Sequence, residues 1–122
     1  MLVIRNEQMA LLGMAGKQQF RQHAANYLRN TVPTVCASMT EQHILQSVDY
    51  AMAMCQFHGF AREVDVLQYL NLMYVFGFSF DRDPKLPWVP RILNDRSKGP
   101  QARLEWLCSH ALYEAGRARG PE

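Results

Sequence analysis

The sequence predicts an all-α fold, a single-domain bundle of five to six helices with an aromatic and proline-rich loop before the short penultimate helix. Apolar residues recur three or four positions apart along most of the chain, as on the buried face of a helix. No segment shows the alternation of apolar and polar residues that is typical of strands. Glycine and proline fall between the helical periods. With 122 residues, 48% of them hydrophobic, we assign 1–122 to one domain.

The first helix is expected over residues 5–30, where apolar residues keep helical spacing. Pro33 should end it, because the residue before a proline disfavours the α conformation. Residues 34–39 then form a short connector of about one helical turn, with Cys36 packed inward.

Two helices follow in the middle of the chain. The second should begin at Thr40, a good N-cap residue, and run to about His58, with Gly59 in the left-handed conformation that often ends a helix. The third is expected over residues 63–76 and should end at Gly77. Since the third helix is apolar on nearly every face, we expect it to be buried between the other helices.

The remaining elements surround the loop at residues 78–91, which holds two phenylalanines, a tryptophan and three prolines. A short helix is expected at about 88–94, followed by a polar turn at 95–99. The last helix should cover 100–116, with a proline at its first position and a glycine closing it. Residues 116–122 are expected to form a frayed tail.

Composition narrows the classes of partner and compartment. The net charge is +2 and the basic residues are scattered, so we expect no nucleic-acid partner. The apolar run at residues 1–4 is too short for a signal peptide, and no window has the 18 to 20 apolar residues of a membrane span. Three cysteines in apolar surroundings predict free thiols and a reducing compartment. We therefore expect a cytoplasmic protein, with export by a machine that needs no N-terminal signal left open.

Two constellations could carry chemistry, and both favour a structural interpretation. Cys55 and His58 lie three residues apart, but a structural zinc site needs four ligands, and a reactive cysteine needs a thiolate environment. Asp81 and Asp83 could hold a cation, but the surrounding loop offers too few other oxygen ligands, whereas turns and caps explain both residues. We expect no catalytic residue, metal or cofactor; the alternative is a small enzyme using Cys55 or Asp81.

The block from Leu72 to Leu93 resembles a known family. Its segments LMYVFG (72–77), FDRDPKLPW (80–88) and IL (92–93) are similar to the pattern LMxxFGxxFDxDPxLPWxxxIL of small, uncharacterised bacterial helical proteins. These proteins are often encoded beside type VI secretion spike and effector genes. The resemblance implies an accessory role, as an adaptor or chaperone-like partner of a secreted effector. The alternative is an immunity protein that neutralises a cognate toxin. The resemblance implies no catalytic residue.

The partner is therefore expected to be another protein, a secreted effector, a toxin or a spike component. Aromatic residues dominate binding hot spots, so the loop and its borders are the predicted contact surface. The competing interpretation, favoured for the tryptophan, is that these side chains brace the bundle. The predicted partner-binding residues are Tyr74, Phe78, Phe80, Asp81, Asp83 and Trp88.

Overall fold

The computed structural model describes residues 13–118, and their side chains up to residue 116. Within this range the regular secondary structure consists of helices alone, which confirms the predicted all-α class. The elements are α1 Met14–Thr31, α2 Pro33–Cys36, α3 Glu41–His58, α4 Glu63–Phe76, the 3-10 helix η2 Phe80–Arg82, α5 Trp88–Leu93 and α6 Pro100–Ala118. No helix in this part of the chain is long and apolar enough to cross a membrane.

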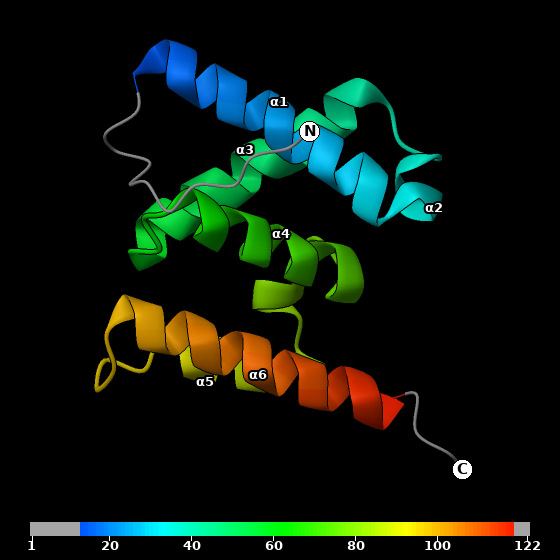
Figure 1. Ribbon diagram of the computed structural model, residues 1–122. Coiled ribbons are helices and arrows are strands. Elements are labelled where there is room, and N and C mark those ends of the chain that lie inside the picture. Colours follow the sequence, from blue (N-terminus) through cyan, green and yellow to red (C-terminus); the bar gives the residue numbers. More distant parts are fainter. Residues whose placement is uncertain (1–12, 119–122) are drawn as a thin grey trace.

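The helices are stacked in successive levels, with α4 in the middle (Figure 1). α1 packs on α3, α3 packs on α4, and α4 separates this half from the pair formed by α5 and α6. Burial on several faces of α4 follows from its lack of a polar stripe, as the sequence predicts. Its fully or nearly fully buried apolar side chains are Val66, Leu67, Tyr69, Leu70, Leu72 and Met73.

Both predicted boundaries of α3 are confirmed. The Thr40 side chain accepts a hydrogen bond from the His43 backbone N–H at 3.1 Å. At the other end Gly59 has φ +84, and the Phe60 N–H donates to the Cys55 carbonyl at 2.8 Å. These contacts satisfy backbone groups that a helix end would leave unpaired.

Three boundaries differ from the prediction. The Gly13 backbone is extended, with ψ −178, so α1 begins at Met14; residues 5–12 of the expected first helix lie outside the described part. Pro33 occupies the first position of α2, where a helix does not need a backbone N–H donor. The proline therefore begins α2 as well as ending α1. Gly116 does not close α6, which continues to Ala118, because only Gly59 and Gly77 among the described glycines take a positive φ.

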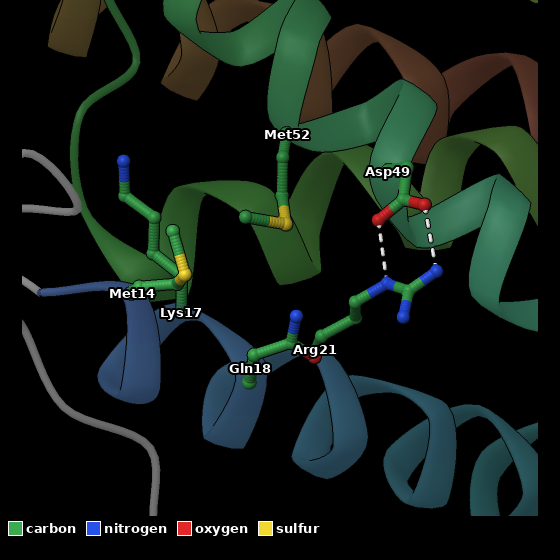
Figure 2. Close-up of a pocket in the computed structure, with 6 residues that line it drawn as sticks. All are labelled: Met14, Lys17, Gln18, Arg21, Asp49 and Met52. Carbon is green, nitrogen blue, oxygen red and sulfur yellow. Dashed lines mark hydrogen bonds and ion pairs between the residues drawn. The ribbon is translucent and has the colours of Figure 1, made fainter.

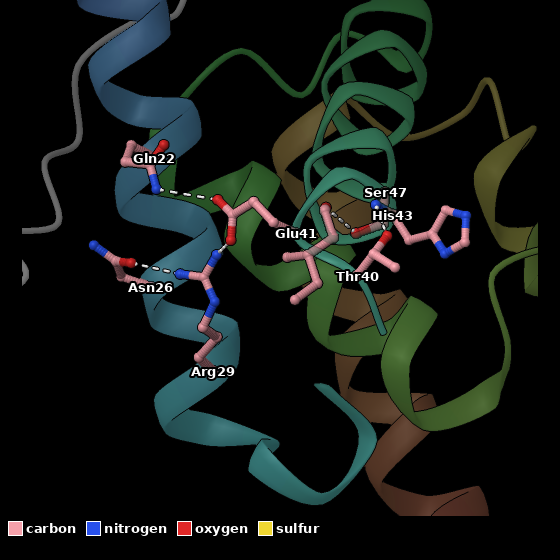
Figure 3. Close-up of polar contacts among 8 residues, drawn as sticks. Gln22, Asn26, Arg29, Thr40, Glu41, His43 and Ser47 are labelled. Atoms are coloured by element: carbon pink, nitrogen blue, oxygen red, sulfur yellow. Dashed lines mark hydrogen bonds and ion pairs between the residues drawn. The ribbon is translucent and has the colours of Figure 1, made fainter. Parts of the chain in front are cut away.

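Polar contacts fix the start of α3 against α1 (Figure 3). Glu41 forms an ion pair with Arg29 and accepts a hydrogen bond from Gln22 at 3.4 Å. These exposed pairs contribute little free energy, but they orient the first turn of α3. The Glu41 side chain points toward α1, whereas the His43 ring points away from it (Figure 3). The His43 side of α3 is therefore left for other contacts.

Arg103 of α6 joins the ends of α3 and α5. Its guanidinium donates to the Leu93 carbonyl at 2.6 Å and to the His58 carbonyl at 3.1 Å, and it lies 5.7 Å from the centre of the Phe60 ring. The carbonyls at helix C-termini carry partial negative charge, so the cation suits both. The His58 ring stacks on Phe60, and its Nε2 is buried with no hydrogen-bond partner among the described residues.

The position of His58 predicts a loss of stability in mild acid. Burial, followed by the nearby charge of Arg103, lowers the pKa of His58 below its ordinary 6.5, and the more weakly acting Asp81 opposes the shift. As the pH falls below 6.5 the unfolded chain takes up a proton that the folded chain excludes, so the free energy of unfolding decreases until the lower, folded-state pKa is passed. Urea titrations between pH 7.5 and 5 should show this decrease, and His58→Gln should reduce it.

His43→Gln provides the control, because it removes a histidine whose side chain is exposed at the first turn of α3. The decrease measured in this variant is the reference with which that of His58→Gln is compared. An unchanged slope in His58→Gln would show that other groups cause the loss.

Candidate functional site

The segment after α4 turns back against the bundle through Gly77 and η2. Gly77 has φ +112, a conformation that side chains with a Cβ rarely adopt, and it ends α4. The turn places Phe80 in the core, where its ring lies 5.1 Å from that of Tyr69 and its exposed fraction is 1%. Phe80 is thus a core residue that holds η2 against α4.

The Asp81 cluster, which we define as Tyr50, Tyr69, Asp81 and Arg82, joins this segment to two helices. The hydroxyls of Tyr50 from α3 and Tyr69 from α4 both donate to Asp81 Oδ2, at 2.8 and 2.9 Å. Asp81 Oδ1 accepts no hydrogen bond from the described residues, and Arg82 Nε lies 3.8 Å from it. A buried carboxylate needs such donors, because its desolvation is costly.

Burial keeps both tyrosines in the protonated form that this arrangement requires. It raises the pKa of Tyr69 far above its ordinary value of 10, and the negative charge of Asp81 adds to the effect. The pKa of Tyr50 is raised by burial and then by its hydrogen bond to Asp81. Both hydroxyls therefore donate throughout the physiological pH range, and the cluster is a stable brace.

Trp88 braces the next part of the chain. Its exposed fraction is 9%, and its ring contacts those of Phe76 and His110, with centroid distances of 5.7 and 4.6 Å. It thereby connects α4, α5 and α6. In this conformation a partner could reach little of the indole.

The two aspartates of the D-x-D motif have separate roles. Asp83 Oδ1 accepts the Lys85 backbone N–H at 2.9 Å, which is the turn geometry predicted for this motif, whereas Asp81 faces the tyrosines. Within residues 13–118 no group of three or more histidine, cysteine, aspartate or glutamate side chains is arranged to hold a metal ion.

A cleft of about 330 Å³ lies beside the Asp81 cluster, and Phe78 is at its rim. Phe78 is 41% exposed, and its ring packs on Tyr74 at 4.8 Å. The Tyr74 and Ser47 hydroxyls are hydrogen-bonded at 2.7 Å, which ties the end of α4 to α3. The described residues that line the cleft are His43, Gln46, Ser47, Tyr50, Met73, Phe78, Ser79 and Arg82.

The structure therefore divides the predicted partner-binding residues. Phe78 lies at the cleft and Tyr74 supports it, while Phe80, Asp81 and Trp88 are buried and Asp83 is held in a turn.

The predicted partner-binding residues include none of the cleft residues on α3. These residues, His43, Gln46, Ser47 and Tyr50, follow one another at intervals of three, one and three, so they share a helix face. This stripe of polar and aromatic residues was a signal that could have been used.

A larger hollow of about 600 Å³ lies between α1 and α3 (Figure 2). Arg21 and Asp49 cross it with two hydrogen bonds of 2.7 and 2.8 Å, so each satisfies the other. Met14, next to the first described residue, also lines it. A charged ligand could bind in this hollow only if the ion pair between Arg21 and Asp49 were broken. The hollow is therefore a weaker candidate site than the cleft at Phe78, although it is larger.

The described part also contains an apolar groove of about 290 Å³ between α4 and α6. Val75 and Leu112 line it and are 63% and 77% exposed. No charged side chain is among its described lining residues, and the amides of Gln68 and Asn71 are its strongest polar groups, of which Asn71 accepts a hydrogen bond from Tyr27. We expect it to be less selective for charge than the cleft.

The three cysteines are free thiols in the structure. Burial raises the pKa of Cys36, Cys55 and Cys108, so the reactive thiolate form is disfavoured. Cys55 Sγ donates to the Asp65 carbonyl at 3.9 Å. These surroundings fit inert, packed thiols better than a nucleophile.

Comparisons of the chain with protein families, with curated proteins and with solved structures found no match. The resemblance of residues 72–93 to the secretion-associated family therefore stays a prediction. The geometry of the site has to carry any functional argument.

Proposed function

We propose that this chain is a non-enzymatic protein-binding accessory, an adaptor or chaperone-like partner of a type VI secretion effector. The family resemblance supplies the biological setting. The observation that carries the binding role is the half-exposed Phe78, held at the rim of a cleft by a loop whose other aromatic side chains, Phe80 and Trp88, are buried.

The contrast between Phe78 and Phe80 supports this role. Two residues apart, they are 41% and 1% exposed, so the loop places one aromatic ring in the core and offers the other to solvent. Large aromatic side chains in well-packed surroundings are typical binding anchors. Because the Phe78 ring packs on the Tyr74 ring, Phe78 loses less conformational entropy on binding than a mobile side chain would.

The cleft suits binding better than catalysis. Its described lining contains one histidine, His43, and no carboxylate or cysteine beside it to act as orienting group or nucleophile. The hydroxyls of Ser47 and Tyr50 are engaged with Tyr74 and Asp81. These groups are arranged for packing and hydrogen bonding.

Phe78→Ala should impair partner capture without unfolding the protein. Affinity purification of the tagged chain from its native cells, with mass spectrometry, should identify a stoichiometric partner, and the variant should recover at least tenfold less of it. Phe57→Ala is the matched control, since Phe57 is a 78% exposed phenylalanine on α3 outside the cleft. Equal recovery by both variants, with unchanged circular dichroism, would contradict the proposed surface.

The same purification allows the two accessory roles to be separated. For an adaptor, deletion of this chain should reduce the level or delivery of the effector and leave the sensitivity of cells to it unchanged. Protection of cells by this chain against the co-purified protein would instead establish an immunity protein.

A further inference from the structure

We infer that the cleft at Phe78 recognises an acidic segment of the partner, with Arg82 binding a carboxylate and Phe78 covering an adjacent apolar side chain. This inference rests on the proposed protein-binding function and assigns the chemistry of the partner. It follows from the charges around the cleft and from the way in which Arg82 is held.

Arg82 is the charged group best placed to contact a bound segment. Its side chain is 72% exposed, and it lines the cleft together with Phe78. In its ion pair with Asp81, Arg82 Nε lies 3.8 Å from Oδ1. The Nη1 and Nη2 ends of a guanidinium form the fork that binds a carboxylate with two hydrogen bonds.

Asp81 orients Arg82 without satisfying it. The aspartate side chain is 3% exposed, and its Oδ2 already accepts hydrogen bonds from Tyr50 and Tyr69. It therefore stays in place behind the cleft and attracts the Nε side of the guanidinium. Because the Arg82 side chain is 72% exposed, an incoming carboxylate can approach its guanidinium from solvent.

The charged residues on the helices around the cleft also favour a negatively charged partner segment. On α3 the lining residues include His43 and no carboxylate, and Asp49 of the same helix is paired with Arg21. The α4 sequence has no charged residue after Asp65. The same loop also carries the exposed Lys85.

Two carboxylates flank Arg82 in the sequence, but neither is among the described residues that line the cleft. Asp81 is buried in its cluster, and Asp83 accepts the Lys85 backbone N–H. Arg82 is the one formal charge among the described lining residues, so a segment with a carboxylate is favoured there over a basic segment.

The apolar part of the site defines the second requirement. The apolar and aromatic residues among its described lining include Phe78, which is 41% exposed, Tyr50, and Met73, which is 1% exposed. A leucine or phenylalanine beside the acidic residue would remove the exposed part of the Phe78 ring from water. The expected motif is thus an acidic residue next to a large apolar one.

Selection of a phage-displayed library of random 12-residue peptides on the full chain tests the inference. The selected peptides should carry an aspartate or glutamate near an aromatic or aliphatic residue. A synthetic copy of the best peptide should bind Arg82→Gln at least tenfold more weakly. Arg82→Glu should prefer the same peptide with its acidic residue changed to lysine, which would reverse the charge selectivity. Arg91→Gln is the control and should change the affinity less than twofold.

Four results would overturn the assignment of Arg82. The first three are selection of basic or neutral peptides, an equal loss of affinity in Arg91→Gln, and chemical-shift changes in an NMR titration with the peptide that map to the groove between α4 and α6. Undiminished capture of the native partner by Arg82→Gln would also overturn it while leaving the protein-binding role intact. Failure to recover any stoichiometric partner with the unmodified chain would instead count against the proposed function.

Discussion

Phe80→Ala is expected to destabilise the protein by about 3 to 5 kcal/mol, the range for removing a buried phenylalanine from a core. The Phe80 ring is 1% exposed and packs against the fully buried Tyr69. Its removal leaves a cavity at the point where η2 meets α4, and the Asp81 carboxylate next to it would lose its fixed position. Urea unfolding followed by circular dichroism measures this loss.

The matched variant is Phe78→Ala, which removes the same ring two residues away. Because Phe78 is 41% exposed, its loss should cost about 1 kcal/mol or less. The pair of variants therefore separates bracing from binding: Phe80 should control stability and Phe78 partner capture. Similar stabilities for the two variants would contradict the division of the loop into a buried and an exposed ring.

Local signals in the sequence were sufficient for most of the helices. The Thr40 cap, the left-handed Gly59 and the apolar character of residues 63–76 each depend on neighbours within a few positions, so they could be recognised without the fold. The errors also have local causes. Gly116 was expected to close the last helix from its residue type alone, and nothing in the sequence distinguishes a glycine that ends a helix from one inside it.

The site could not be predicted in the same way, because it is formed by contacts between distant segments. Tyr50 meets Asp81 across 31 positions, and Ser47 meets Tyr74 across 27. The density of aromatic residues led to the prediction of a contact surface at residues 78–91, yet it could not distinguish the buried Phe80 and Trp88 from the exposed Phe78. That distinction depends on the direction in which the chain turns after Gly77.

Asp81→Ala should have the second large effect, a destabilisation of about 3 kcal/mol, because the buried Tyr69 hydroxyl and the partly buried Tyr50 hydroxyl would lose their acceptor. Asp83→Ala is the control: this carboxylate only completes an exposed turn and should cost about 1 kcal/mol or less.

Tyr69→Phe shows whether the loss at Asp81 arises through the hydroxyls. In a double-mutant cycle the two substitutions should be strongly non-additive, since each removes the same hydrogen bond. Additive free energies of unfolding would mean that Asp81 acts on the fold by another route. Because Asp81 also holds Arg82, Asp81→Asn should weaken binding of an acidic peptide even at temperatures where the variant is folded. A variant with lower stability and unaltered peptide affinity would show that the carboxylate braces the loop without orienting the arginine.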